Sequence, residues 1–434
     1  MENANRVVNR RRVLFGIAGA AGTAILAACG GSATSTPAPA PPAATTSAAG
    51  AAATATKAPA AATTSTGATT GSTAAATSAP AATTAASSAV SGSAALAQPT
   101  FGAIAGGSNI QLTGAGSTFI NPLLTTWADV FKQKVANNVS INYQSIGSGG
   151  GIQQITQKTV DFGASDAPLT DAQVAAAPGI LHIPMVHGPV VATYNLKLDV
   201  NKPLQFSGQT LVDIYFGTIT KWNDKAIAAD NPGIQLPTTD IAVVYRSDGS
   251  GTTSIWVDYL SKISTDWESK VGRGTSVKFP TGIGAKGNEG VSGQVKQVEG
   301  GIGYVELAYA IENKLPLSLV KNAAGEFIAP SIDSASRAAA LPSYPADLRF
   351  SITNPPAEVK GAYPITGTTW LLAYTNETDM NKTVALVDFI RWAISPAGDE
   401  VAKSKVYPSI PAPLKEKVLG QLQKIMVNGT PVYK

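Results

Sequence analysis

The sequence predicts an α/β protein with a largely parallel sheet, carried behind an N-terminal leader and a long low-complexity segment. Three observations support this organisation. From about Ser108 onwards, short apolar runs alternate with amphipathic segments, as strands and helices do in α/β proteins. Glycine-rich turns follow three of the apolar runs. The charged fraction of the 434 residues is only 14%, against about 25% in ordinary globular domains, which indicates a sizeable non-globular part.

The expected strands and helices alternate along the globular part. The apolar runs predict strands at residues 110–113, 139–144, 161–164, 190–195, 241–245, 303–305 and 370–374. The amphipathic stretches predict helices at residues 121–135, 151–158, 210–216, 252–263, 291–298 and 382–394. Open α/β sheets bind their ligands at the carboxyl ends of strands, so the residues that carry the chemistry are expected there.

The first 28 residues have the composition of an export signal. Arg10, Arg11 and Arg12 precede an apolar run over residues 13–28, which is shorter than the roughly 20 residues that span a bilayer. The single cysteine, Cys29, follows Leu-Ala-Ala and resembles the lipid-bearing cysteine of a bacterial lipobox. We therefore expect residues 1–28 to be a signal peptide and Cys29 to anchor the protein to the membrane through lipid. The alternatives are an ordinary cleaved signal or a buried thiol, and both Sec and twin-arginine export stay open.

Residues 29–107 are expected to be a tether. Between residues 30 and 100 the chain is almost entirely Ala, Thr, Ser, Pro and Gly, and Lys57 is its only charge. Such a segment buries too little apolar surface to offset the entropy of ordering it. A flexible coil of this length reaches roughly 45 Å, so the globular part would stand away from the membrane. Glycosylation of the tether is left open.

The charge balance and the scarcity of cysteine and histidine exclude several classes of function. The net charge of +4 arises within the first 100 residues, so the globular part is neutral and offers no basic surface to nucleic acid. One cysteine and two histidines exclude a disulfide framework and a Cys/His metal site. We therefore expect neither a metal nor a cofactor.

Three strand-to-helix turns, at residues 113–119, 147–151 and 248–253, combine glycine with Ser or Thr. Glycine lets backbone N–H groups approach a ligand, the hydroxyls add donors, and a helix N-terminus adds partial positive charge. Any one of these turns is more often only a helix cap. Together, and with Arg246 and Asp166 close by in the sequence, they predict a cage for a tetrahedral oxyanion.

The motifs TGAGSTF, IGSGGG, VDFGASDAPLT and RSDGSGTT, in this order and spacing, resemble the phosphate-binding proteins of bacterial phosphate ABC transporters, a class II periplasmic-type binding family. The resemblance covers nearly all of residues 110–410. It implies two α/β lobes joined by two crossover segments, near residues 188–195 and 362–370, with the ligand in the cleft. Lobe I would comprise residues 108–190 and 365–434, and lobe II residues 191–364.

The resemblance also implies a site and a role. Phosphate would be bound by backbone and side-chain donors, one acceptor and one charged fork: Thr118, Phe119, Ser148, Asp166, Arg246, Asp248, Ser250, Gly251 and Thr252. Asp166 is the acceptor, and Arg246 is the fork that Asp248 holds in place. The protein would be a monomeric, non-enzymatic receptor outside the cytoplasm that delivers inorganic phosphate to permease subunits.

Other interpretations remain. The ligand could be sulfate, molybdate or another oxyanion, and a secreted phosphatase-like protein could use the same scaffold. The GxGxxG pattern at residues 282–287 resembles a dinucleotide fingerprint, but it does not follow the first strand, so we interpret it as a structural or transporter-facing loop. His182 and His187 are expected to be ordinary hydrogen-bonded histidines, and Trp127 and Trp392 to be core residues.

Overall fold

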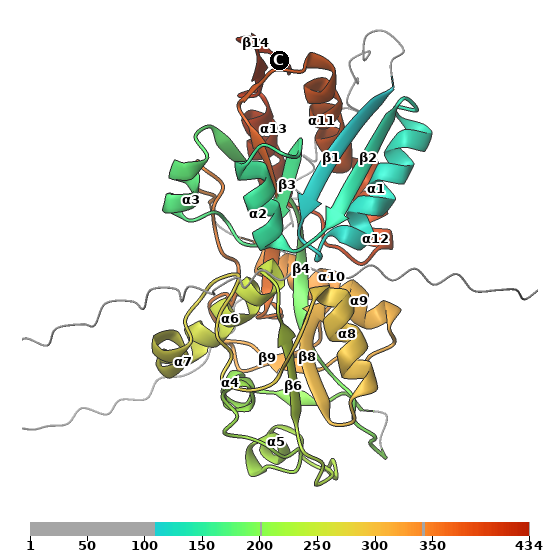
Figure 1. The fold of residues 1–434 in the computed structure, drawn as a ribbon. Helices are drawn as coiled ribbons and strands as arrows, with labels where there is room; N and C mark the ends of the chain where they lie inside the picture. The colour runs from blue at the N-terminus through green and yellow to red at the C-terminus, as the bar shows by residue number, and fades with distance from the viewer. Residues whose placement is uncertain (1–108, 200–201, 341–342, 434) are drawn as a thin grey trace, which may run out of the picture. The chain divides into compact units, whose positions relative to one another are not determined.

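The computed structural model of the protein describes residues 109–199, 202–340 and 343–433 (Figure 1). All of them belong to one compact unit, Ala89–Lys434. The predicted signal peptide, the predicted lipidation at Cys29 and the predicted tether of residues 29–107 lie outside the described residues.

One eight-stranded sheet organises the described residues. Its strands, in spatial order, are β2 (Val139–Ser145), β1 (Ile110–Gly116), β3 (Phe162–Ser165), β11 (Thr366–Tyr374), β4 (Ile180–Tyr194), β8 (Gly301–Glu306), β6 (Ala242–Arg246) and β7 (Ile283–Ala285). Two small sheets accompany it: β10 (Phe327–Ile328), β9 (Leu319–Lys321) and β5 (Gln205–Phe206), and β12 (Asn376–Glu377), β13 (Met426–Val427) and β14 (Thr430–Pro431).

The helices flank both ends of this sheet. They are α1 (Asn121–Lys134), α2 (Ser148–Thr156), α3 (Asp171–Ala176), α4 (Gly208–Phe216), α5 (Lys225–Asp230), α6 (Gly251–Ile263), α7 (Thr265–Lys270), α8 (Gly287–Gln297), α9 (Leu307–Glu312), α10 (Ile332–Ala338), α11 (Met380–Ala393), α12 (Pro396–Ser404) and α13 (Ala412–Leu422). Each of the six predicted helices overlaps an observed one. Most of the helices that the sequence did not predict are six or seven residues long, too short for a clear amphipathic period.

The sheet is parallel at its two ends and antiparallel in the middle. β1 runs parallel to β2 and β3, and β6 runs parallel to β7 and β8. The central strand β11 is antiparallel to β3 and β4, and β4 is antiparallel to β8. The predicted largely parallel sheet is therefore wrong at the centre, because the chain crosses the middle of the molecule on long strands without a returning helix.

β4 is the strand that joins two lobes. Its first part, residues 180–189, pairs with β11, and its second part, residues 190–194, pairs with β8. The first of these lobes carries α1–α3 and α11–α13, and the second carries α4–α9 (Figure 1). We call them lobe I and lobe II. Residues near the point where β4 passes from one lobe to the other can therefore contact side chains of both lobes.

Only the last third of β4 was predicted, as residues 190–195. The missed part contains Pro184 and Pro189, and proline argues against a central strand because it cannot donate to the ladder. The structure accommodates Pro184 where the register with β11 shifts between Thr369 and Trp370. All 15 residues of the strand are buried, so burial outweighs the poor local propensity.

The segment around residues 348–351 contacts both lobes. Ser351 Oγ donates to Asp258 on α6 of lobe II over 2.8 Å. Residues 191–364 were assigned to lobe II, yet Leu348 accepts a hydrogen bond from Trp370 Nε1 over 2.8 Å and Arg349 pairs with Asp171 over 2.7 Å. The ring of Phe350 also packs edge-on against Trp370, 5.5 Å between centroids. This stretch contacts lobe I because Trp370 supplies a long-range apolar partner that local sequence does not indicate.

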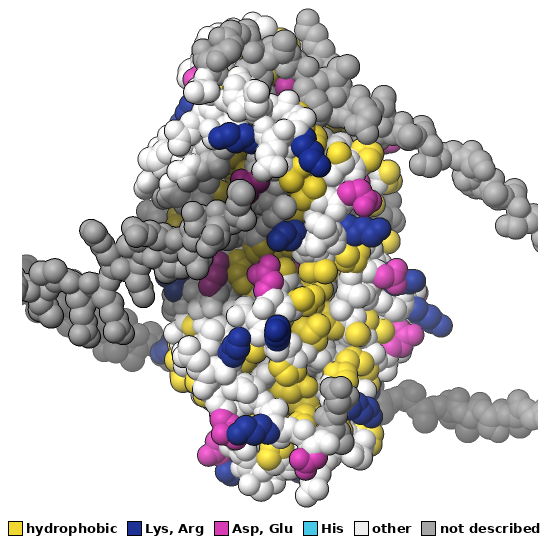
Figure 2. All heavy atoms as spheres, turned by 90° about the vertical axis from the view of Figure 1, so that its right-hand side faces the viewer, with side chains coloured by type: hydrophobic (Ala, Val, Ile, Leu, Met, Phe, Trp, Pro, Cys, Tyr) yellow, Lys and Arg dark blue, Asp and Glu magenta, His cyan; other side chains and the backbone are white. Residues whose placement is uncertain are grey.

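The core and the surface agree with the composition. Trp127 and Trp392 are both buried in the main hydrophobic cluster, as predicted. On the face in Figure 2, Lys and Arg side chains alternate with Asp and Glu among polar and apolar groups, without a continuous basic patch. Within residues 109–433, as far as they are described, no helix is both long and apolar enough to cross a membrane.

Candidate functional site

The first glycine-rich turn lies between β1 and α1. Ser117 Oγ donates to Asp166 Oδ1 over 2.5 Å and accepts the N–H of Phe119 over 3.0 Å. Both Thr118 and Phe119 are buried. The turn therefore brings two backbone N–H groups and two hydroxyls to the carboxyl end of β1, next to a carboxylate from β3.

The second turn brings Ser148 to the same carboxylate from α2. Ser148 Oγ lies 3.4 Å from Asp166 Oδ2 and accepts the backbone N–H of Asp166 over 3.2 Å. It also accepts the N–H of Gly251, the first residue of α6 in lobe II, over 3.1 Å. Ser148 thus connects the helix starts of the two lobes at Asp166.

Lobe II contributes a guanidinium held by a carboxylate. Arg246 Nε and Nη2 donate to Asp248 Oδ1 and Oδ2 over 2.8 and 2.6 Å, a bidentate pair. Asp248 Oδ1 also accepts the N–H of Gly287 over 3.0 Å. Burial alone would raise the pKa of Asp248, but the hydrogen bonds and charge of Arg246 lower it, so the carboxylate stays ionised. Arg246 is 4% exposed, and its remaining Nη1 faces Thr252 Oγ1 at 3.4 Å.

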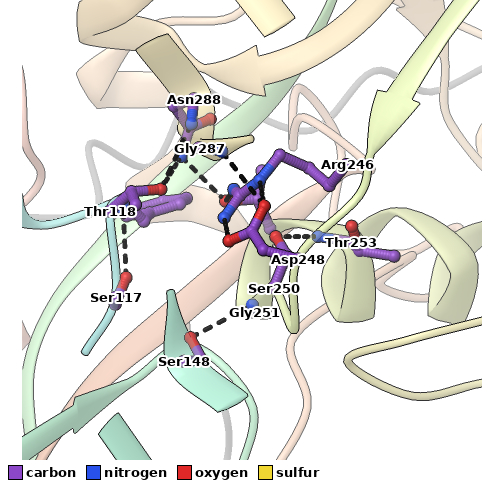
Figure 3. A network of polar contacts seen from close by, with 12 residues as sticks. Ser117, Thr118, Ser148, Arg246, Asp248, Ser250, Gly251, Thr253, Gly287 and Asn288 are labelled. Carbon is purple, nitrogen blue, oxygen red and sulfur yellow. Dashed lines mark hydrogen bonds and ion pairs between the residues drawn. The ribbon is translucent and has the colours of Figure 1, made fainter. Parts of the chain in front are cut away.

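Asn288, at the start of α8, bridges the lobes. Its Nδ2 donates to Thr118 Oγ1 over 2.7 Å and to Thr252 Oγ1 over 3.1 Å. Its Oδ1 accepts the N–H of Glu306 over 3.0 Å, which fixes the amide orientation. Figure 3 shows Asn288 beside Thr118 on one side of the network, with Arg246, Asp248 and Ser250 on the other.

Ser250 has a local role in addition to its place in the network. Its Oγ accepts the N–H of Thr253 over 3.0 Å and so caps α6. The hydroxyl proton is not used by this cap and can be donated elsewhere. The structure therefore brings together all nine residues that the sequence singled out: Thr118, Phe119, Ser148, Asp166, Arg246, Asp248, Ser250, Gly251 and Thr252.

The network members that were not predicted as site residues include Ser117, Asn288 and Thr369. Ser117 lies inside a predicted turn, so its proximity could have indicated it. Thr369 Oγ1 donates to Asp166 Oδ1 over 2.7 Å from β11, and no sequence signal points to it. Asn288 directly follows the GxGxxG pattern of residues 282–287, which was interpreted as a loop. In the structure this pattern forms β7 and the first residue of α8. Gly287 then contacts Asp248, and Asn288 contacts Thr118.

Asp166 is the acidic centre of this network. It is 3% exposed, and burial raises its pKa to about 6 against the opposing hydrogen bonds of Ser117, Thr369 and Ser148 and the charge of Arg246. The carboxylate is therefore ionised at neutral pH but protonates in mildly acidic solution. It is an acceptor surrounded by donors.

The histidines stay apart from this chemistry. His182 Nε2 accepts the N–H of Leu169 over 3.0 Å, and His187 Nδ1 lies 2.9 Å from Thr368 Oγ1. Burial lowers the pKa of His182 to about 4 and that of His187 to about 3, so both are neutral. Within the described part of the chain, no group of three or more His, Cys, Asp or Glu side chains could hold a metal ion.

Two lobes share one sheet, and a helix start of lobe II meets the buried acid of lobe I through Ser148. This arrangement defines a binding protein of the two-lobed periplasmic type. A family model described as a PBP superfamily domain matches residues 77–397. The Phosphate-binding protein PstS of Xylella fastidiosa is 43% identical over 310 residues, covering 71% of this chain and 84% of that protein. That of Methanocaldococcus jannaschii is 35% identical over 312 residues, covering 66% and 79%. The chain belongs to this family of phosphate-binding proteins.

Solved structures agree on the fold. An ancestral soluble variant of the Human Phosphate Binding Protein matches with a TM-score of 0.61 at 18% identity, covering 75% of this chain and 96% of that chain. A high affinity periplasmic phosphate-binding protein, solved with bound phosphate, matches with a TM-score of 0.59 at 21% identity, covering 72% and 93%. The predicted two-lobed α/β fold class is confirmed.

Proposed function

We propose that this chain is an extracytoplasmic receptor that binds inorganic phosphate and delivers it to the permease of a phosphate ABC transporter. The observation that carries the proposal is Asp166, a buried acceptor that receives the hydroxyls of Ser117, Ser148 and Thr369 from lobe I. The start of α6 in lobe II meets it through the N–H of Gly251, which donates to Ser148 Oγ. Membership of the phosphate-binding family supports it. The nine predicted residues are proposed as the phosphate site, in which Asp248 holds Arg246 in place and Asn288 is the bridge between Thr118 and Thr252.

The carboxylate of Asp166 is unexpected in a site that binds an anion. An ionised Asp166 repels every anion, and closure of the lobes strengthens that repulsion by excluding water. Phosphate at neutral pH still carries at least one O–H, which Asp166 can accept, whereas sulfate is fully ionised. The donors around Asp166 therefore suit a tetrahedral oxyanion in general, and Asp166 favours one that brings a proton.

The enzyme alternative has no support in the arrangement of side chains. A hydrolase of this kind would need a nucleophile with a general base. The two histidines are engaged with Leu169 and Thr368, and the relatives are named as binding proteins. We therefore expect binding without turnover.

The anchoring of the receptor is also a proposal. Lipid on Cys29 and a tether over residues 29–107 would hold a monomeric globular part outside the membrane, close to its permease. Labelling of cells with a radioactive fatty acid would test it: wild-type protein is expected to take up label and Cys29→Ala to take up none. Equal labelling would exclude Cys29 as the site.

Titration calorimetry tests the binding function. The purified protein, dialysed free of phosphate, is expected to bind phosphate more tightly than sulfate by a factor of about 10⁴, because an analogue without the O–H leaves Asp166 unpaired. Molybdate gives the comparison for a larger oxyanion. Equal affinity for sulfate would overturn the assignment to phosphate, and steady release of phosphate from a phosphomonoester would favour an enzyme.

A further inference from the structure

Three tyrosines donate hydrogen bonds to the backbone of the first glycine-rich turn. Each donates its hydroxyl to one of three successive backbone carbonyls: Tyr143 to Ser117 over 2.7 Å, Tyr309 to Thr118 over 2.6 Å and Tyr407 to Phe119 over 2.6 Å. The tyrosines are separated by more than 90 residues along the chain. Every peptide plane in the turn therefore has its own long-range hydrogen bond.

These bonds fix where the N–H groups of the turn point. In a planar trans peptide the C=O and the following N–H point in opposite directions. Each hydroxyl therefore directs one N–H group, that of Thr118, Phe119 or Ile120, away from the tyrosine that holds the preceding carbonyl. The Phe119 N–H does face Ser117 Oγ, which in turn donates to Asp166.

The three hydroxyls come from both lobes. Tyr143 is on β2, and Tyr407 follows α12, so both belong to lobe I. Tyr309 is on α9 of lobe II and reaches Thr118 across the cleft. Two of the bonds can thus persist when the lobes separate, but the Tyr309 bond requires that they be closed.

Two of the tyrosines also contact an acidic side chain, which is a second acceptor for the phenol proton. Tyr407 Oη also lies 2.8 Å from Glu306 Oε2, and a phenol has only one proton to give. Burial raises the pKa of Glu306 well above its usual range, and its Oε2 also accepts the N–H of Ala308 over 2.9 Å. Of the two acceptors of Tyr407, the Phe119 carbonyl is the nearer, at 2.6 Å against 2.8 Å for Glu306 Oε2.

Tyr309 Oη has two acceptors for its single proton, the Thr118 carbonyl at 2.6 Å and Glu289 Oε1 at 2.9 Å, and the carbonyl is the nearer. Burial raises the pKa values of Tyr143, Tyr309 and Tyr407 well above their usual range. All three are therefore protonated donors throughout the physiological pH range.

We propose that Tyr143, Tyr309 and Tyr407 are positioning residues of the phosphate site, which orient the N–H groups of the Ser117–Phe119 turn toward the anion and, through Tyr309, couple that orientation to closure of the lobes. The inference rests on the proposed function for its ligand. It assigns a role to three residues that do not touch the anion themselves.

The test uses Tyr→Phe variants, which remove one hydroxyl and keep the ring. Tyr143→Phe, Tyr309→Phe and Tyr407→Phe are each expected to weaken phosphate binding by about 3- to 10-fold, the effect of one ordinary hydrogen bond. Tyr374→Phe is the matched control: it loses a buried bond of the same type, to the Ile155 carbonyl over 3.1 Å, away from the turn. Its stability should fall, and its phosphate affinity should stay at the wild-type value.

Two further readouts separate positioning from general destabilisation. In stopped-flow binding, Tyr309→Phe should mainly speed dissociation of phosphate, since its bond exists only in the closed state, whereas Tyr143→Phe and Tyr407→Phe should also slow association. Amide hydrogen exchange in the phosphate-free protein should be faster at Thr118 and Phe119 in the two lobe I variants and unchanged in Tyr374→Phe.

The outcomes distinguish this inference from the proposed function. If wild-type protein binds no phosphate, the proposed function fails, and the exchange rates of the turn still decide whether the tyrosines orient it. If wild-type protein binds phosphate but the three variants match Tyr374→Phe in affinity and exchange, the positioning role is overturned.

Discussion

Gly251 and Ser148 meet across the cleft: the backbone N–H of Gly251 in lobe II donates to Ser148 Oγ in lobe I over 3.1 Å. A Cβ atom placed on Gly251 would lie 2.5 Å from both Ser148 Oγ and Asp166 Oδ2. Only glycine therefore allows the start of α6 to approach the acid of the opposite lobe. The contact joins a helix N-terminus, a hydroxyl and a carboxylate at one point.

This contact predicts the effect of Gly251→Ala. The added methyl group should keep the lobes from closing on Asp166 and lower phosphate affinity by 100-fold or more, about 2.7 kcal/mol. Gly293→Ala in α8 is the control, because nothing lies within 4 Å of its added Cβ and alanine favours a helix. Calorimetric titration of both variants checks the expectation, and near wild-type affinity in Gly251→Ala would contradict the close approach.

Arg246 and Asp248 should have unequal effects. Arg246→Ala is expected to weaken phosphate binding severely, since each charge-assisted hydrogen bond contributes roughly 1.5 to 3 kcal/mol and the fork can make two. Asp248→Asn should cost less, because it only loosens the fork. Arg273→Ala is the control, because Arg273 is an exposed arginine whose ion pairs, with Asp258 and Glu268, lie at the surface. If Asp248→Asn is as harmful as Arg246→Ala, the roles assigned to the pair are wrong.

Asp166→Asn should change ligand choice more than phosphate affinity. Without the negative charge, sulfate is no longer repelled, and the new amide can donate to it. We expect measurable sulfate binding in the variant together with a smaller loss of phosphate affinity, both by competition calorimetry. Asp240→Asn, at an exposed ion pair with Lys221, should leave the discrimination intact. Full discrimination in Asp166→Asn would mean that another group selects the ligand.

The same variant should make stability less dependent on pH. Burial raises the pKa of Asp166 from 3.8 to about 6, so the folded state favours the protonated form. This contribution to stability is complete below the unfolded pKa and is lost as pH rises through about 6. In phosphate-free buffer the melting temperature of Asp166→Asn, relative to wild type, should therefore increase from pH 4 to pH 8.

The size of this effect follows from the shift. About two pKa units correspond to roughly 3 kcal/mol at most between the two ends of the pH range. A relative melting temperature of Asp166→Asn that stays flat or falls with pH would show that Asp166 is not destabilised by burial.

Removal of residues 30–100 should leave binding unchanged. Their composition predicts no folded core, and the described residues begin at 109. A protein that starts near Gly107 is expected to keep the melting temperature and phosphate affinity of the full mature chain. A loss of either would show that this segment contributes to the fold or the site.

The sequence by itself determined the features that are encoded locally. The alternation of apolar and amphipathic segments indicated the α/β class, and the Ser- and Gly-rich turns indicated where the donors lie, because both depend on neighbours within a few residues. Arg246 and Asp248 are two residues apart in one motif, so their pairing could be predicted from the sequence. The neutral charge of the globular part also follows from counting.

Only the tertiary structure decided how these pieces meet. Asn288 reaches Thr118 across 170 positions, and Tyr407 reaches Phe119 across 288. The sequence did not predict the full length of β4, because its prolines argue against a central strand. Burial between β11 and β8 stabilises it as a strand nevertheless. Such contacts depend on how the whole sheet packs rather than on local propensity, so no local sequence pattern predicts them.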